Sequence, residues 1–208
     1  MMHRISFFIF WSEKAFVTIF GSILGNAKML LWGIHLTGIV KCVGIPRIES
    51  GISGRIRIGK RGCLRSARCS NIAGILRPVS LGTIGRGKIE LGDDVGISST
   101  VIVSQNRVSI GNRVQIGVNC TIVDTDFHPV DPVARARGDG GRSAPIILED
   151  DVWLGMNVIV LKGVRIGRGS VVAAGSVVIR DLPCGVLAGG NPARGLRPLA
   201  PEAVSAAK

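Results

Sequence analysis

The 208-residue chain has few aromatic residues, which make up 4% of it, and it has no tyrosine. Hydrophobic residues nevertheless account for 46% of the chain, and 29 residues are glycine. A chain of this length can bury one substantial core, which must here be built from aliphatic side chains. Because β-branched residues favour strands and glycine favours turns, the composition predicts short strands with many tight turns rather than a helical bundle.

Acidic residues are scarce in the first part of the chain. Residues 1–80 hold 12 Lys and Arg against two acids, a net charge of +10, whereas residues 81–208 hold 14 against 12, a net charge of +2. This asymmetry indicates either a solvated basic face or attraction to an anionic surface, such as lipid headgroups or a polyanionic substrate. Nucleic acid is not an expected partner, because basic and aromatic residues do not alternate and no known reader motif occurs.

Paired cysteines are also missing. The five cysteines are odd in number, scattered, and contain no C-x-x-C motif, so they predict neither a disulfide framework nor a zinc site. Small buried thiols in a reducing cytoplasm are the expected state. The cysteines are Cys42, Cys63, Cys69, Cys120 and Cys184.

Uninterrupted hydrophobic runs are too short to predict a membrane-spanning helix. The uncharged runs at residues 15–27 and 29–40 contain 13 and 12 residues, and a spanning helix needs about 20. Residues 1–44 are therefore expected to form a separate segment of two amphipathic helices, divided around residues 21–26.

Two roles are open for this N-terminal segment. It can pack against the main domain, or it can contact a membrane peripherally, as the aromatic cluster at residues 7–11 beside basic residues suggests. A short signal peptide with Arg4 in its charged region is a further alternative.

From residue 91 an aliphatic residue recurs every six positions, with a restart of the register at two places. Period six does not fit an α-helix and is typical of a parallel β-helix, in which three short sides close a coil of 18 residues. The aliphatic residues then point inward and stack on one another, and most strand edges are paired internally. The positions are Leu91, Ile97 and Val103, then Ile110, Ile116 and Ile122, then Leu148, Leu154, Val160, Ile166, Val172 and Val178.

These observations predict an all-β solenoid over residues 45–190, because weaker matches extend the repeat back to residue 45. Residues 191–208 are expected to form a C-terminal capping segment and tail. The stretch DTDFHPVDPVARARGDGGRSAP, residues 124–145, interrupts the repeat, and residues 128–145 are expected to protrude as a loop. His128 stands at its start, whereas His3 and His35 lie in the apolar N-terminal segment and are interpreted as structural.

Four motifs carry a family resemblance: DFHP at 126–129, VWLGMN at 152–157, AAGSVV at 173–178 and GGNPARGLR at 189–197. Through them the chain, over residues 45–199, resembles the hexapeptide-repeat acyltransferases. The galactoside, maltose and capsular-polysaccharide O-acetyltransferases are the most similar branch. The resemblance implies left-handed coils, a homotrimer with active sites between subunits, and acetyl-CoA as co-substrate without a metal.

Acetyl transfer to a hydroxyl needs a base for the hydroxyl proton and an acid for the departing thiolate. Histidine can perform both steps near neutral pH, and His128 matches the catalytic histidine of the family. An acceptor for its second ring nitrogen fixes the tautomer. Asp124, Asp126 or a backbone carbonyl can fill that role, since Asp124, Asp126 and His128 would point to one side of a strand.

The resemblance also implies a cofactor path. Trp153 matches a tryptophan that lines the active site, with a core aromatic as the alternative. The backbone N–H groups around Gly155 and Met156 are candidate oxyanion or thioester donors, although Met156 stands where relatives often have serine. The pantetheine arm would contact Ala173, Ala174 and Gly175, and the phosphates would meet Arg180, Arg194, Arg197 and, less clearly, Lys162.

The acceptor end departs from the galactoside pattern, because Ser98, Ser99 and Gln105 stand where that branch has asparagine and aspartate. The sequence therefore predicts a cytoplasmic O-acetyltransferase acting on a sugar, in capsular or exopolysaccharide synthesis. The sequence leaves three alternatives. A serine O-acetyltransferase usually has a longer helical N-terminal domain, and a zinc carbonic anhydrase of this fold needs three histidine ligands. A non-catalytic β-helix scaffold would not need the DFHP loop.

Overall fold

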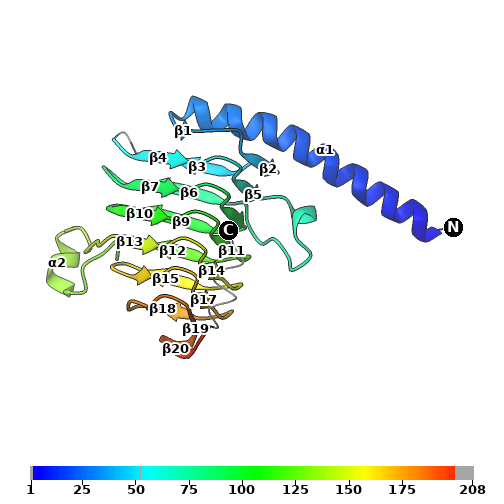
Figure 1. Cartoon of the computed structure of the whole chain (residues 1–208). Coiled ribbons are helices and arrows are strands. Elements are labelled where there is room, and N and C mark those ends of the chain that lie inside the picture. The colour runs from blue at the N-terminus through cyan, green and yellow to red at the C-terminus, as the bar shows by residue number, and fades with distance from the viewer. Residues whose placement is uncertain (1, 52, 200–208) are drawn as a thin grey trace.

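The computed structural model describes residues 2–51 and 53–199, with side chains from residue 12 onward. Consecutive strands belong to three different sheets in turn, and up to β18 each strand pairs in parallel with the strand three positions earlier in the chain. The chain therefore forms a three-sided β-helix (Figure 1). Sheet A contains β1 (His35–Leu36), β4 (Arg55–Ile58), β7 (Lys88–Leu91), β10 (Arg107–Ile110), β13 (Ile146–Leu148) and β16 (Arg165–Ile166).

Sheet B contains β2 (Lys41–Val43), β5 (Cys63–Arg65), β8 (Gly96–Ser98), β11 (Gln115–Ile116), β14 (Trp153–Leu154), β17 (Val171–Val172), β19 (Val186–Gly190) and β20 (Ala193–Pro198). Sheet C contains β3 (Arg47–Glu49), β6 (Ser80–Thr83), β9 (Val101–Ser104), β12 (Thr121–Val123), β15 (Ile159–Leu161) and β18 (Val177–Val178). Two helices, α1 (Met2–Leu31) and α2 (Pro132–Ala136), and the 3-10 turn η1 (Arg68–Ser70) complete the described elements.

The core is a set of aliphatic columns inside the coils. In sheet B, Ile97 pairs in register with Ile116, Ile116 with Leu154, and Leu154 with Val172. All four side chains are buried. Their stacking is the dominant source of stability in such a fold, because each coil covers the apolar face of the next.

One predicted inward position is wrong by a single residue. Ile102, not Val103, pairs with the inward Ile122 and is fully buried. The corner after Ile97 has one residue fewer than the corner after Ile116, and Ser99 and Asn119 occupy the corresponding left-handed positions, with φ of 49° and 62°. The chain therefore reaches sheet C one residue earlier in that coil.

Helix α1 corrects two sequence predictions. It is one continuous helix of 30 residues, not two helices divided around residues 21–26. Its segment Ser12–Leu31 is long and apolar enough to cross a membrane, although the uncharged runs had predicted no such segment. Lys28 interrupts the uncharged run but not the helix, because lysine has a high helix propensity; its amine donates to the carbonyl oxygen of Pro46 at 3.2 Å.

The glycines and polar residues of α1 explain its continuity. A Cβ atom on Gly21 would lie 2.6 Å from the carbonyl oxygen of Cys42, so glycine permits the helix to touch strand β2. Beside it, the hydroxyl of Ser22 accepts from the Cys42 N–H at 3.0 Å. The Asn26 amide accepts from the Val40 N–H at 3.1 Å and donates to the Val40 carbonyl at 2.7 Å. These side chains occupy the open edge of the first coil.

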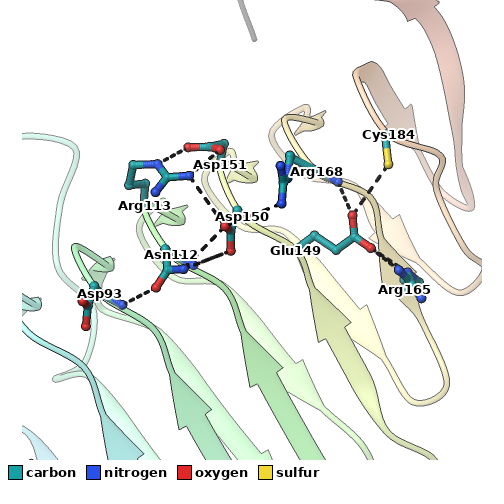
Figure 2. A network of polar contacts seen from close by, with 9 residues as sticks. All are labelled: Asp93, Asn112, Arg113, Glu149, Asp150, Asp151, Arg165, Arg168 and Cys184. Atoms are coloured by element: carbon teal, nitrogen blue, oxygen red, sulfur yellow. Dashed lines mark hydrogen bonds and ion pairs between the residues drawn. The ribbon is translucent and has the colours of Figure 1, made fainter. Parts of the chain in front are cut away.

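A polar ladder follows the corner between sheets A and B (Figure 2). Arg113 forms two hydrogen bonds with Asp151, at 2.6 and 2.8 Å, and Asn112 donates its N–H to Asp150 at 2.8 Å. Lower in the ladder, the Arg168 N–H and the Arg165 guanidinium both bind the Glu149 carboxylate and hold its pKa below the usual range. Corner residues of successive coils are thus tied together by charge-assisted bonds.

The C-terminal motif GGNPARGLR forms a hairpin rather than a loose cover. Strand β19 pairs in parallel with β17, and β20 turns back antiparallel to β19 as the last strand of sheet B. Ala188 and Ala193 are buried under it. The hairpin therefore ends the parallel stacking at the end of the molecule opposite α1 (Figure 1).

Candidate active site

The predicted loop leaves the β-helix through a narrow neck. The Ala144 N–H donates to the Asp124 carbonyl at 3.0 Å, and Thr125 and Ser143 form an isolated antiparallel bridge. Between these ends, α2 and its flanking turns protrude from the side of the coils (Figure 1). The loop therefore has a fixed base, from which its first residues present His128.

Asp124 is the anchor of this neck and does not orient the histidine. Its carboxylate is buried and accepts from the Ser104 hydroxyl at 2.7 Å. It also accepts from the backbone N–H groups of Gln105, at 2.7 Å, and Asn106, at 3.0 Å. Three donors account for the buried charge, so the prediction that Asp124 supports His128 directly is wrong.

Asp126 is paired with Lys162 of the next coil, at 2.6 Å between Oδ1 and Nζ, and both side chains are about one-third exposed, at 31% and 32%. The Asp126 carbonyl accepts from the His128 N–H at 2.7 Å. The pair thus holds Asp126, whose carbonyl in turn accepts from the histidine N–H. Lys162, predicted as a phosphate contact, is placed in this loop group.

His128 itself is exposed, and its ring has no hydrogen-bond or ion-pair partner among the residues that the structure describes. It follows Phe127, whose φ of 61° is unusual for a residue with a side chain. Arg135 of α2 donates to the carbonyls of Pro129, at 2.8 Å, and Val130, at 3.0 Å. The backbone on both sides of His128 is therefore held, while the imidazole is accessible.

A second group of predicted residues gathers in an apolar hollow on sheet B. Trp153 is 54% exposed and Met156 is 40% exposed, so the alternative of a core tryptophan is wrong. Sequence reasoning missed seven of the lining residues, and two of them, Asn71 and Ala73, come from an irregular segment far away in the sequence. The hollow is lined by Asn71, Ala73, Gly117, Val118, Trp153, Gly155, Met156, Val171, Val172, Ala173, Ala174 and Leu187.

Gly155 does not supply the free backbone donor that the sequence predicted for this hollow. Its N–H donates to the Val172 carbonyl at 2.8 Å and is therefore used within the coils. The Met156 N–H has no acceptor among the described residues, and the N–H groups of Val118 and Ala174, one coil away on either side, share this property. Three N–H groups in segments that line the hollow thus have no partner in the described chain, and Val118 itself is buried. Gly175, at φ 72°, forms the turn after Ala174.

The predicted phosphate contacts lie at the C-terminal end of the molecule. Arg180 and Arg194 are exposed and have no ion-pair partner in the described part of the chain. Arg197 is exposed and donates only to the Pro198 carbonyl, at 3.4 Å. All three guanidinium groups are therefore available to an anion.

Two of the predicted acceptor residues are buried. Ser98 and Ser99 are inside the fold; the Ser99 hydroxyl donates to Asn119 at 2.6 Å and accepts from the Arg77 N–H at 3.2 Å. Their burial contradicts a contact with a sugar. Gln105 is half-buried, and its side-chain oxygen accepts from the Thr125 hydroxyl at 2.5 Å, so its role as an acceptor contact stays a prediction.

The described residues contain no group of three or more His, Cys, Asp or Glu side chains that could hold a metal ion. The site therefore consists of two parts on different sides of the coils. One is the loop with His128, Asp126 and Lys162, and the other is the hollow on sheet B with its free N–H groups. His128 is not among the residues that line the hollow.

Comparison with known proteins agrees with this geometry. Residues 145–180 match the family model of the bacterial transferase hexapeptide, six repeats. The chain is 47% identical over 91 residues to a galactoside O-acetyltransferase of Lactococcus lactis, and these residues cover 44% of this chain and 43% of the relative. The predicted resemblance to hexapeptide-repeat acyltransferases is confirmed.

Other hexapeptide-repeat relatives give the same result. A galactoside O-acetyltransferase of Escherichia coli is 42% identical over 96 residues, which are 46% of each chain. The chain thus spans less than half the length of these curated relatives. A crystal structure of a hexapeptide-repeat acetyltransferase of Vibrio cholerae, complexed with acetyl-CoA, is similar with a TM-score of 0.50 and 27% identity. It covers 92% of this chain and 88% of the Vibrio chain.

A further solved structure supports the fold alone. It is an N-acyltransferase of Bacillus cereus in complex with dTDP and 3-hydroxybutyryl-CoA, with a TM-score of 0.67 at 17% identity. The match covers 87% of this chain and 92% of the Bacillus chain.

Proposed function

We propose that the protein is an acetyl-CoA-dependent O-acetyltransferase that acetylates a sugar hydroxyl, with His128 as general base. The observation that carries the proposal is the fixed backbone on both sides of an accessible histidine, at a loop that leaves a hexapeptide β-helix. Asp124 anchors that loop from inside, and Lys162 holds Asp126, whose carbonyl accepts from the His128 N–H. A loop of purely structural purpose would not need its histidine exposed at this point.

The chemistry follows from these groups. A ring nitrogen of His128 takes the proton of the acceptor hydroxyl while its oxygen attacks the thioester carbonyl. The new C–O bond forms, and the charge that develops on the carbonyl oxygen is stabilised by a backbone N–H, for which Met156 is the candidate. Collapse breaks the C–S bond, and the histidine returns its proton to the departing CoA thiolate.

The hollow on sheet B is the proposed acetyl-CoA site. Its apolar lining and its free N–H groups at Val118, Met156 and Ala174 suit an arm that carries both methylene and amide groups. Arg180, Arg194 and Arg197 are proposed to meet the phosphates. The crystal structure of the Vibrio acetyltransferase with acetyl-CoA supports acetyl-CoA as the co-substrate.

A homotrimer with left-handed coils and active sites between subunits is part of the proposal. His128 and the hollow are separate in one chain, so a complete site is expected where the loop of one subunit meets the hollow of another. Sheet C offers an apolar outer face for such contact, with Ile159, Leu161 and Ile179 each 37–44% exposed. The outer face of sheet A instead carries charged residues such as Arg57 and Lys88.

The acceptor is proposed to be a sugar of a capsular or exopolysaccharide precursor, modified in the cytoplasm. All five cysteines are free thiols, which fits a reducing compartment. The burial of Ser98 and Ser99 leaves no galactoside-type polar contacts at those positions, so a simple galactoside is a weaker acceptor hypothesis. Serine O-acetylation and a non-catalytic scaffold are outcomes of the test below.

The test measures formation of CoA from acetyl-CoA with sugars, amino sugars and serine as acceptors. CoA should be quantified by chromatography, because Cys184 is exposed and would react with a thiol reagent. His128→Ala is expected to lower the rate by about 10²–10⁴-fold. His35→Ala, at the other exposed histidine of the described chain, is the matched control.

Three outcomes would contradict the proposal. Activity unchanged in His128→Ala removes the histidine as base. Turnover with serine alone replaces the sugar by an amino acid as acceptor. Failure to bind acetyl-CoA, measured by calorimetry on the full chain, favours a scaffold.

A further inference from the structure

Helix α1 has two different faces. Gly21, Ser22, Gly25, Asn26 and Met29 recur at helical spacing and lie toward the first coil, where Met29 is fully buried. From Phe16 onward the opposite face, on the same helical period, is exposed and apolar, and Ser12 and Glu13 precede it. It consists of Phe16, Ile19, Phe20, Ile23, Leu24, Ala27, Leu30 and Leu31.

The apolar face is large and continues beyond the helix. Ile19 is 59% exposed and Ile23 is 62% exposed, and the rings of Phe16 and Phe20 lie 4.3 Å apart between centroids. Ile39, in the turn before β2, is 82% exposed and lines a shallow hollow together with Ile23 and Leu30. Contiguous exposed apolar surface of this extent marks an interaction site in a protein that is otherwise well packed.

Unpaired positive charge lies in the two coils nearest to α1. The side chains of Lys41, Arg55, Arg57 and Lys60, all in the first two coils, are exposed and form no ion pair within the described chain. Lys60 lies directly beside Gly38, which lines the same hollow as Ile39. In contrast, Arg107, Arg113 and Arg165 in later coils are paired with acids.

We propose that α1 lies in the plane of an anionic lipid bilayer, with this apolar face in the acyl region and these cations on the headgroups. An apolar stripe with unpaired cations in the neighbouring coils matches the chemistry of such an interface, where basic residues near the surface are attracted to anionic headgroups. A helix of 30 residues is about 45 Å long. The polar bonds of Ser22 and Asn26 to the first coil hold it across the end of the β-helix, so that its length runs along the membrane.

This placement sets the height of the loop above the bilayer. Four steps of sheet A separate β1 from β13, and at about 4.8 Å a step the loop stands roughly 20 Å from the first coil. The acceptor hydroxyl would then be presented at a fixed distance from the membrane, as the head of a lipid-linked glycan is. The membrane contact itself does not depend on the acetyltransferase proposal.

The test is flotation of the full chain with vesicles of phosphatidylcholine, with and without phosphatidylglycerol. Wild-type protein is expected to float with the anionic vesicles and to be released by high salt. Ile23→Glu is expected to weaken binding by at least about tenfold, because burial of one isoleucine contributes more than one decade of affinity. Val133→Glu, at an equally exposed residue on α2 (62%), should float like wild type.

His128→Ala should also float like wild type, which separates membrane binding from catalysis. The proposal is overturned if wild-type protein stays in the lower fraction or if Ile23→Glu floats equally well. If Ile23→Glu changes the oligomeric mass of the protein in solution without vesicles, the apolar face is instead a contact between copies of the chain. Resistance of the bound protein to alkaline carbonate would show a spanning helix and exclude the in-plane arrangement.

Discussion

The carboxylate of Asp124 accepts a hydrogen bond from the hydroxyl of Ser104, 2.7 Å away in the preceding coil. Ser104 belongs to the corner between sheets C and A, where five residues lie between the inward Ile102 and Val108. The same corner also supplies the N–H groups of Gln105 and Asn106. A corner of one coil thus receives the loop that leaves the next.

Replacement of this carboxylate is expected to unfold the neck. Asp124→Ala leaves buried N–H groups without an acceptor, and we expect it to lower the free energy of unfolding by about 2–5 kcal/mol. Asp124→Asn keeps one carbonyl oxygen and should cost less. Asp139→Ala, in the same loop but exposed and paired only with Arg137, should cost less than about 1 kcal/mol. Urea denaturation measures all three, and equal losses for the two alanine variants would contradict the anchor role.

The Asp126–Lys162 pair is expected to affect rate more than stability. Because both side chains are partly exposed, loss of the pair in Lys162→Met should change the free energy of unfolding by less than about 1 kcal/mol. Asp126, whose carbonyl accepts from the His128 N–H, would lose its support, and kcat/KM should fall by about tenfold, or about 1.4 kcal/mol of transition-state stabilisation. Lys162→Arg should restore most of the rate, and Lys88→Met, at an exposed lysine of sheet A, should leave it unchanged.

At Gly21 we expect alanine to lower the stability of the protein, although helix propensity alone predicts an increase. Alanine usually stabilises a helix interior over glycine by about 1 kcal/mol. Here the new Cβ would lie 2.6 Å from the Cys42 carbonyl oxygen and 2.7 Å from the Gly44 nitrogen, so Gly21→Ala should destabilise the protein. Proteolysis at Lys14 and Lys28 should become faster as α1 separates from the first coil. An increase in the thermal midpoint would show that the helix does not dock as described.

The buried thiols predict alkaline instability. Burial raises the pKa of Cys42 to about 12 and that of Cys120 to about 11, from 9.0. The unfolded chain therefore loses these protons first, so stability is unaffected below pH 9 and falls as pH rises from 9 towards 11 and 12. The slope approaches roughly 1.4 kcal/mol per pH unit for each thiol. Cys42→Ala should reduce the slope, and a slope equal to that of the wild type would contradict the assignment.

The same burial predicts selective alkylation. Iodoacetamide should label Cys184, which is exposed, in native protein and should not label Cys42 or Cys120. Mass spectrometry of the digested protein reads the sites directly. Rapid labelling of Cys42 would show that α1 opens frequently, because the Cβ and Sγ atoms of Cys42 lie against Gly25.

The repeat made the coils predictable, because an aliphatic residue every six positions leaves few other folds. The prediction was wrong where a coil changes length, because it chose Val103 instead of Ile102 as the inward residue. A corner with one residue fewer keeps the same kinds of residue, so the amino-acid composition does not reveal it. It also divided α1 at glycines that serve close contact with β2 rather than a turn. Sequence motifs located His128 and the sheet-B hollow. They could not show that Ser99 is buried against Asn119, or that Asn71 reaches the hollow from a distant segment.

The bonds of Ser22 and Asn26 to strand β2 have a consequence for assembly. A β-helix whose first coil has unpaired backbone groups can pair with the last coil of another molecule, and this pairing can repeat without limit. Here the N–H groups of Val40 and Cys42 are already satisfied by α1 side chains. At the other end, sheet B finishes in the antiparallel strand β20, which breaks the parallel pattern. Growth into a fibre is therefore blocked along sheet B at both ends of the molecule.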